Sequence, residues 1–268
     1  MLECVVNISE GRNHDLLSTM ADRVGIDLLN LHTDGDHNRS VFTLFGTTRV
    51  RDLARQAVAA LDITQHTGVH PRLGVVDVVP FVPLDLSTFD DALLARNEFA
   101  EFAGHELRVP CFVYGPERTL PHIRAHAFKD LLPDFGPQRP HPTAGAMCVG
   151  ARNVLVAYNL WLNKDVSLDS AKLLANSLRS ESVRALGFQV GEYVQVSMNL
   201  IDPLRVGPAD VYDLIAKKFK IDRAELVGLI PARVLASIPR SRWAELDVGN
   251  EQTIEWRIAQ RNQIGRQN

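Results

Sequence analysis

The decapeptide Gln65-His66-Thr67-Gly68-Val69-His70-Pro71-Arg72-Leu73-Gly74 separates two strongly patterned segments of this 268-residue chain. Residues 51–61 before it have the apolar spacing of an amphipathic helix. Residues 75–82 after it form an apolar run, interrupted by Asp77, that is typical of a buried strand. Two histidines, an arginine, two glycines and a proline therefore lie at a helix-to-strand junction. Because loops on a rigid scaffold often carry chemistry, we predict that this segment is functional.

His70 is the strongest catalytic candidate in this segment. Imidazole exchanges protons near neutral pH, and Pro71 restricts His70 to an extended backbone, which aims the ring. Alternatively, the histidines only cap a helix end and satisfy carbonyls. His66 and His70 have the spacing of two metal ligands on one helix face, but Gly68 and Pro71 argue against a continuous helix. We therefore expect no metal here.

Bulk properties describe an ordinary globular protein. The formal net charge of -3 gives no general attraction to nucleic acid or to an anionic membrane. No apolar run approaches the roughly 20 residues that span a bilayer, and no signal peptide is visible. Cys4, Cys111 and Cys148 lie in apolar surroundings, which indicates buried thiols. We expect a cytoplasmic protein without nucleic-acid or membrane partners.

The first half of the chain alternates strands and helices. Asn13 is a suitable N-cap for the first helix. The polar loop that begins at Asn7 is a candidate for binding an anion or a substrate amide, and Asn38 and Arg39 form a second candidate pair at a strand entrance. The expected order is strand, helix, strand, strand, helix, strand, over residues 2–6, 16–24, 27–31, 40–46, 51–61 and 75–82. This is the order of a ferredoxin-like unit.

The next part of the chain is less regular. We expect a helix over 86–106 and a strand over 109–114, with Pro110 placing that strand at a sheet edge or delaying its start. A short helix over 118–124 follows, and residues 145–152 show no strand or helix pattern. An irregular stretch as long as residues 115–152 inside a compact domain is usually functional or disordered, and its aromatic and apolar content favours an ordered one. Its glycines and alanines would let the backbone lie flat against a planar ligand.

The second half repeats the same architecture without evident sequence repetition. Ser167 or Asp165 caps its first helix, and a polar helix over 251–261 follows the repeat. Strand, helix, strand, strand, helix and strand are expected over residues 153–160, 165–184, 186–190, 193–200, 208–218 and 224–229. We therefore predict an α+β protein of two ferredoxin-like βαββαβ subdomains, residues 1–152 and 153–268.

Long motifs, in order along residues 2 to about 231, resemble the formiminotransferase domain family. They are ECVVNISEGRN (3–13), HTGVHPRLGVVD (66–77), PFVP (80–83), PDFGP (133–137), GA (145–146) with GAR (150–152), and VSMNL (196–200) with Asp202. The resemblance implies two subdomains facing each other across a cleft or tunnel, and a homodimer. It also implies transfer of a formimino group between N-formimino-L-glutamate and tetrahydrofolate, the folate acting as co-substrate.

The resemblance also suggests roles for individual residues. The histidine before Pro-Arg is the family's general base, which is His70 here, and the folate-contacting stretch corresponds to residues 143–152. Because arginine binds carboxylates in bidentate geometry, Arg12, Arg39, Arg72, Arg124 and Arg152 are candidates for the glutamate carboxylates. The predicted substrate- or folate-binding residues are Asn7, Arg39, Arg72, Arg124, Thr143, Gly145, Ala146, Gly150, Ala151 and Arg152.

The chain departs from the family at two positions on the second strand. The family usually has aspartates there, and this chain has Asn30 and His32, so a carboxylate that would orient the base or bind the substrate is either missing or replaced by Asp34 or Asp36. Three alternative functions remain open. The fold could bind folate without catalysis or with altered specificity, or it could be a dimeric interaction protein with a vestigial pocket. It could also be a metal-dependent amide or amidine hydrolase that uses His32, His37, His66 and His70.

Overall fold

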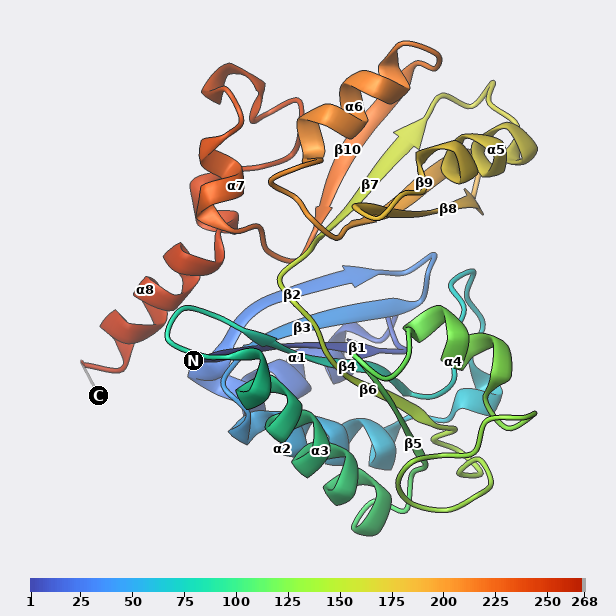
Figure 1. Cartoon of the computed structure of the whole chain (residues 1–268), viewed down its shortest axis with the longest axis vertical. Coiled ribbons are helices and arrows are strands. Elements are labelled where there is room, and N and C mark those ends of the chain that lie inside the picture. The colour runs from blue at the N-terminus through green and yellow to red at the C-terminus, as the bar shows by residue number, and fades with distance from the viewer. Residues whose placement is uncertain (267–268) are drawn as a thin grey trace. The chain divides into compact units, whose positions relative to one another are not determined.

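The computed structural model describes residues 1–266 and forms two compact units, Met1–Asn153 and Val154–Asn268 (Figure 1). Each unit has its own sheet and its own hydrophobic core. The strand orders of the two sheets confirm the predicted α+β fold of ferredoxin-like units. No helix among residues 1–266 is long and apolar enough to cross a lipid bilayer.

The first unit contains a six-stranded sheet in the order β2-β3-β1-β4-β6-β5. Strand β1 is antiparallel to β3 and β4, which gives the ferredoxin-like arrangement, and β6 and β5 extend the sheet in parallel beyond β4. The elements are β1 (Leu2–Ile8), α1 (His14–Val24), β2 (Leu28–Asp34), β3 (Arg39–Phe45), α2 (Thr48–Ala60), β4 (Val76–Pro83), α3 (Phe89–His105), β5 (Cys111–Tyr114), α4 (Leu120–His126) and β6 (Met147–Ala151).

Local sequence signals set several of these boundaries. The Asn13 side chain accepts a hydrogen bond from the Leu16 N–H and so caps α1, as predicted. Thr88 and Asp91 form a reciprocal capping box at the start of α3. Strand β5 lies at the sheet edge and begins just after Pro110, which confirms both consequences expected of that proline.

The prediction that residues 145–152 are irregular is wrong. Residues Met147–Ala151 form β6, a fully buried strand between β4 and β5. A strand that is covered on both faces needs no polar-apolar alternation, so its five residues gave no periodic signal. Gly150 further weakened the strand pattern.

The two faces of the first sheet are covered differently. Helices α1, α2 and α3 pack on one face through residues such as Leu17, Leu53 and Phe99, which form the main core (Figure 1). On the other face, Ile123 of α4 packs against Phe112 and its neighbours in a smaller apolar cluster. Helix α4 is therefore the helix that brings side chains to the face opposite α1–α3.

The second unit contains a four-stranded antiparallel sheet in the order β10-β7-β9-β8. Helices α5 and α6 contribute to a single core with alternate residues of the strands. The elements are β7 (Val156–Leu162), α5 (Leu168–Leu178), β8 (Val183–Val190), β9 (Tyr193–Leu200), α6 (Pro208–Ala216), β10 (Ile221–Val227), α7 (Ala232–Ala236) and α8 (Ile254–Ile264).

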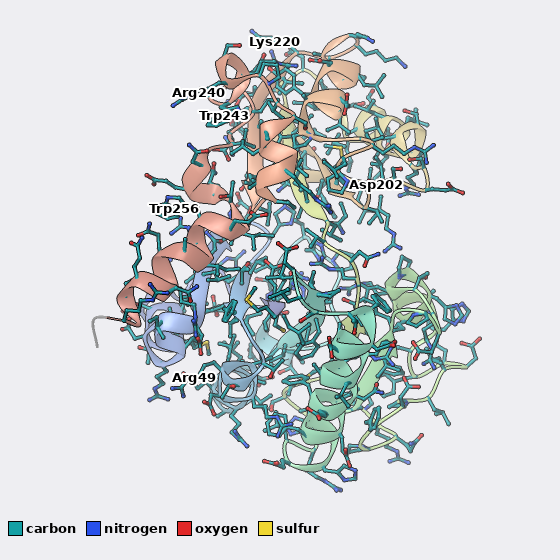
Figure 2. All side chains as sticks on the ribbon, turned by 60° about the vertical axis from the view of Figure 1, so that its left-hand side comes forward. Arg49, Asp202, Lys220, Arg240, Trp243 and Trp256 are labelled. Atoms are coloured by element: carbon teal, nitrogen blue, oxygen red, sulfur yellow. The ribbon has the colours of Figure 1, made fainter. Side chains whose placement is uncertain are left out.

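Helix α5 is shorter than predicted. Ser167 caps its start as expected, but the helix ends at Leu178 and not near residue 184. The Ser180 N–H donates to the Val183 carbonyl in a turn, after which β8 begins. In the segment after α7, Trp243 packs against the core of the second unit. Its Nε1 donates to the Ile238 carbonyl at 3.0 Å, and Arg240 lies over its ring; Figure 2 labels both residues.

Candidate active site

The loop that carries His70 connects α2 to β4 and is hydrogen-bonded through its backbone to residues 143–146. The Ile63 N–H donates to the Thr143 carbonyl at 2.7 Å, and the Val75 N–H donates to the Ala144 carbonyl at 3.0 Å. The Ala146 N–H returns a bond to the Leu73 carbonyl at 3.0 Å. These backbone bonds fix both ends of the loop to residues 143–146.

Asn38 fastens the middle of the loop. Its side chain accepts from the Gly11 N–H at 2.8 Å and donates to the Thr67 carbonyl at 3.0 Å, and its own carbonyl accepts from His66 Nε2 at 2.8 Å. Asn38 is 7% exposed and has a φ of 47°, a conformation that asparagine tolerates better than most residues. Its role in the structure is to position the loop.

Arg72 is also engaged by the loop itself. Its guanidinium donates to the Gly68 carbonyl at 2.8 Å, to the His70 carbonyl, and to His66 Nδ1. His66 therefore carries its proton on Nε2 and is neutral. Burial lowers the pKa of His66, with the Asn38 carbonyl opposing and the Arg72 charge adding to that effect.

His70 is held in one tautomer. Its Nδ1 lies 2.8 Å from the Pro71 carbonyl, and because a carbonyl only accepts, Nδ1 carries the proton and Nε2 the lone pair. The ring meets His37 edge-on, with centroids 6.0 Å apart. Burial, and then the positive charge of Arg39, lowers the pKa of His70 to about 3, against the opposing charge of Asp77. The ring is thus neutral over the physiological pH range.

A buried ion-pair cluster lies on the α4 side of the sheet. Asp77 Oδ2 accepts from Arg39 at 2.7 Å and from Arg124 at 2.6 Å, and Asp77 is completely buried. Its Oδ1 accepts from the Leu73 N–H at 2.8 Å, which ties the cluster to the His70 loop. Although burial raises the pKa of Asp77, the two guanidinium groups lower it to about 2. We refer to Arg39, Asp77 and Arg124 as the charge cluster.

A β-bulge turns Asp77 toward these arginines. Val76 pairs with Ile8 and Val78 pairs with Asn7, so Asp77 is the extra residue on β4. Bulges re-aim side chains and are frequent beside active sites. The Asn7 side chain completes the arrangement, because its Oδ1 accepts from Arg39 Nε at 3.1 Å.

The structure brings together some of the predicted site residues and separates others. Arg39 and Arg124 converge on Asp77, and Asn7 binds Arg39. Asp77 was not predicted as functional, although it is the single acid in an apolar strand. Arg72 belongs to the loop, and Arg152 Nη1 donates to the Asn153 carbonyl at 3.0 Å.

The predicted folate stretch is mostly buried backbone. Gly145 has a φ of 71° and packs so tightly that a Cβ would lie 2.2 Å from the Leu73 carbonyl oxygen. At Gly150 a Cβ would lie 2.1 Å from the Tyr114 ring. Ala146 and Ala151 are buried as well. Protein atoms thus cover these glycines, and their contact with folate stays a prediction.

The acids of the second-strand turn serve a local purpose. Asp34 Oδ1 accepts from the backbone N–H groups of Asp36 and His37, both at 2.8 Å. No side-chain hydrogen bond or ion pair joins the carboxylate of Asp34 or Asp36 to the charge cluster within residues 1–266, and the carboxylate of that cluster is Asp77. Among residues 1–266, no three His, Cys, Asp or Glu side chains are grouped as a metal site requires.

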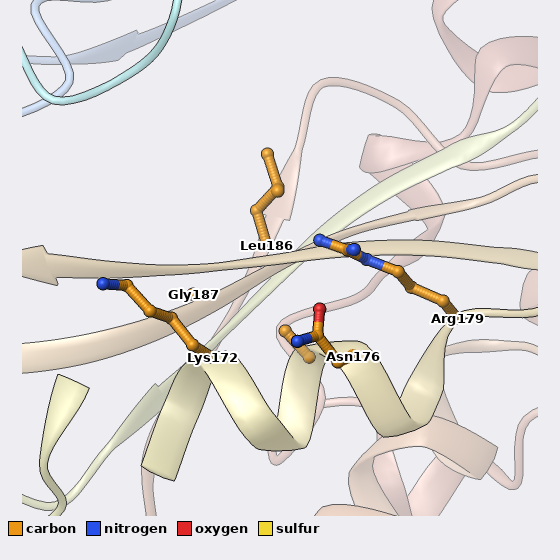
Figure 3. Close-up of a pocket in the computed structure, with 6 residues that line it drawn as sticks. Lys172, Asn176, Arg179, Leu186 and Gly187 are labelled. Atoms are coloured by element: carbon orange, nitrogen blue, oxygen red, sulfur yellow. The ribbon is translucent and has the colours of Figure 1, made fainter. Parts of the chain in front are cut away.

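Two surface hollows lie away from these residues. One, of about 280 Å³, lies between α5 and β8 and is lined by Lys172, Ala175, Asn176, Arg179, Leu186 and Gly187 (Figure 3). The other, of about 260 Å³, lies beside α2 and α3 of the first unit. Neither hollow is lined by a predicted site residue. The predicted residues that lie together are those of the His70 loop and the charge cluster, which we therefore take as the candidate site.

The sequence of the chain is similar to those of known proteins. Residues 1–152 match the family model described as the formiminotransferase domain, N-terminal subdomain. The chain belongs to the formiminotransferase family. This family member is 32% identical to the glutamate formimidoyltransferase of Streptococcus pyogenes serotype M1, over 89% of this chain and 91% of the relative.

Two further relatives show how the formiminotransferase region occurs in different proteins. The chain is 31% identical to the glutamate formimidoyltransferase of Thermoplasma acidophilum, over 90% of this chain and 91% of the relative. It is also 31% identical to the formimidoyltransferase-cyclodeaminase of Gallus gallus, over 88% of this chain. The match covers 51% of the Gallus gallus protein, so the chain spans about half the length of that relative.

Proposed function

We propose that the chain is a glutamate formimidoyltransferase, which converts N-formimino-L-glutamate and tetrahydrofolate into L-glutamate and 5-formimino-tetrahydrofolate. Relatives with this name match along nearly their whole length. The observation that carries the proposal is the His70 imidazole, held in one neutral tautomer by the Pro71 carbonyl beside the charge cluster. A neutral imidazole with its Nε2 lone pair is the form that a general base requires.

The chemistry needs one proton to be moved twice. N5 of tetrahydrofolate attacks the formimino carbon and becomes positively charged, and His70 Nε2 takes the proton from that nitrogen. The tetrahedral carbon then expels the glutamate nitrogen, to which the same imidazolium returns the proton. General base catalysis of this kind typically contributes about 10²–10⁴-fold to the rate.

The other site residues support positioning. Asn7 and Arg39 would hold the charge cluster in place beside the amino-acid substrate, Arg124 would contact that substrate, and Arg72 would keep the His70 loop rigid. Residues Thr143 to Arg152 are the proposed folate-contacting stretch, with tetrahydrofolate as co-substrate and no metal. The family resemblance further supports a homodimer acting in the cytoplasm, and sedimentation of the purified chain tests the dimer.

One assay tests the function. Purified protein is incubated with N-formimino-L-glutamate and tetrahydrofolate, and 5-formimino-tetrahydrofolate is followed by mass spectrometry. We expect product that depends on both substrates and on protein concentration. Binding of tetrahydrofolate without any product would contradict the proposal and favour the non-catalytic folate-binding alternative.

A further inference from the structure

The five candidate arginines differ in what their guanidinium groups already bind. Most have donors committed to the protein. Arg12 donates to Gly35 and Thr67, Arg39 to Asn7 and Asp77, Arg72 to Gly68, His70 and His66, and Arg152 to Asn153. The candidate that binds substrate should retain a donor that is fixed in place and directed away from such partners.

Arg124 has such a donor. Its Nη2 donates to Asp77 at 2.6 Å, whereas Nη1 is buried and makes no hydrogen bond within residues 1–266. A buried donor without an acceptor costs about 1–3 kcal/mol, and more when the group is charged. Such groups in native proteins call for an explanation. The Arg124 side chain as a whole is 19% exposed, so a ligand that reaches it and shifts the atoms over Nη1 supplies the missing acceptor oxygen.

The structure holds Arg124 rigidly. Thr119 caps α4, and Ile123, the preceding residue on the helix, is completely buried. Asp77 anchors the guanidinium from the sheet side. Since these contacts fix the side chain before any ligand arrives, little conformational entropy is lost on binding.

The charge balance of the cluster points to an anionic ligand. One buried carboxylate, Asp77, faces two guanidinium groups, so the cluster carries a net positive charge. Asp77 also accepts from the Leu73 N–H, which places the cluster next to the loop of His70. An anion at Nη1 of Arg124 would neutralise the excess charge close to the general base.

We propose that Arg124, oriented by Asp77, binds the α-carboxylate of the amino-acid substrate. This inference rests on the proposed function. In N-formimino-L-glutamate, the α-carboxylate and the formimino nitrogen are attached to the same carbon, so the carboxylate must lie close to the base that serves the formimino carbon. The glutamate tail of folate is the other carboxylate source, but it lies at the opposite end of that molecule from N5.

Substitution of Arg124 tests the assignment by steady-state kinetics. Arg124→Gln should raise KM for N-formimino-L-glutamate about 10- to 100-fold, the effect of losing a charge-assisted hydrogen bond. KM for tetrahydrofolate should stay unchanged. Arg118→Gln is the matched control, because Arg118 is bound bidentately to Asp134 at 2.9 Å outside the cluster, and its KM values should stay those of the unsubstituted protein.

Arg124→Lys covers the case in which Arg124→Gln does not fold. Lysine keeps the ion pair with Asp77 but lacks the second planar N–H edge. Competitive inhibition by L-glutamate is compared with inhibition by 4-aminobutyrate, which lacks the α-carboxylate. The unsubstituted protein should prefer L-glutamate about 10-fold or more, and Arg124→Lys should lose most of that preference.

The outcomes separate this inference from the proposed function. Absence of formimino transfer by the unsubstituted protein contradicts the function itself. If transfer occurs but Arg124→Lys keeps the preference for L-glutamate, the inference is overturned. A rise in KM for tetrahydrofolate alone also overturns it, because Arg124 would then bind the folate tail.

Discussion

The two sheets share a strand order and a β-bulge at the same position, yet they differ in what the bulged residue meets. In the first unit, Asp77 is the extra residue on β4 and is completely buried between two arginines. In the second unit, the pairs Ile221–Leu162 and Arg223–Trp161 leave Asp222 as the extra residue on β10. Asp222 is exposed. A β-bulge thus places an aspartate at the same position in both units, but only in the first unit does that aspartate bind two arginines.

The connection that precedes the bulge accounts for the difference. In the first unit, residues 61–75 join α2 to β4, and this loop donates the Leu73 N–H to Asp77. In the second unit, α6 and β10 are joined by residues 217–220 alone. The short connection has no room to fold over the bulge. The comparison teaches that the inserted loop and α4, and not the sheet, make the first unit's site.

Removal of the Asp77 carboxylate from the first unit should have the largest effect, and it should destabilise the protein far more than removal of the Asp222 carboxylate from the second unit. Asp77→Asn leaves two largely buried guanidinium groups, 12% and 19% exposed, without their counter-ion, which should lower the free energy of unfolding by about 3–5 kcal/mol. Asp222→Asn, the matched change in the second unit, should cause no measurable loss. Urea denaturation of both variants measures the difference, and equal losses would contradict the contrast between the two bulges.

A methyl group added at Gly68, within the His70 loop, should reduce activity without the large loss of stability expected for Asp77→Asn. In Gly68→Ala, the new Cβ would lie 2.4 Å from the His37 carbonyl oxygen, so the loop must shift. Displacement of a catalytic group by about 1 Å costs up to roughly 10²-fold in rate, and we expect kcat/KM to fall about 10- to 100-fold.

Gly249→Ala, in the second unit, is the control for this substitution. A Cβ there meets the Gln252 side chain at an ordinary 3.5 Å, so activity should not change. Full activity of Gly68→Ala would show that the loop position is not critical.

The dependence of activity on pH should reveal the charge cluster. The low pKa of His70 keeps the acidic limb of kcat/KM well below pH 6.5. In the substrate complex, a bound carboxylate offsets the positive charge of Arg39 and Arg124 and should raise this pKa. We therefore expect the acidic limb of kcat to lie about one pH unit or more above that of kcat/KM, as measured between pH 4 and 8. Coincident limbs would contradict this coupling.

The free energy of unfolding should decrease as the pH falls, because His70 and Asp77 both take up protons more readily in the unfolded chain. The folded-state pKa of His70 is depressed, so its contribution to stability is complete above its ordinary pKa of about 6.5 and is lost as the pH falls toward about 3. The Asp77 pKa is depressed as well, so its contribution is lost between about pH 4 and about pH 2. Because Asp77 stays ionised above pH 4, the kinetic comparison reports on His70.

The sequence predicted the repeated architecture because apolar periodicity and caps are local signals. Asn13, Pro110 and Ser167 each marked a boundary that the structure confirms. Strand β6 escaped prediction because a short strand that is buried on both faces has no alternation. The end of α5 was placed too late because tertiary pairing of Val183 with β9, and not helix propensity, decides it.

The site was predicted only in part for a related reason. His70 and Arg39 could be predicted as site residues because the sequence shows the proline that follows His70 and the strand expected directly after Arg39. The role of Asp77 depends on a bulge and on Arg124, which lies 47 residues further along the chain. A lone acid in an apolar strand was the available signal, since a buried carboxylate requires a partner. Which partner it has is a property of the tertiary structure.

The most direct test of the account is the turnover of His70→Ala with N-formimino-L-glutamate and tetrahydrofolate, measured with and without added imidazole. We expect turnover to fall about 10²–10⁴-fold while the protein stays folded, as circular dichroism reports, and imidazole to restore part of the turnover. His105→Ala, at the exposed end of α3, serves as the control and should be fully active. Turnover by His70→Ala close to that of the unsubstituted protein would contradict the assignment of His70 as the general base.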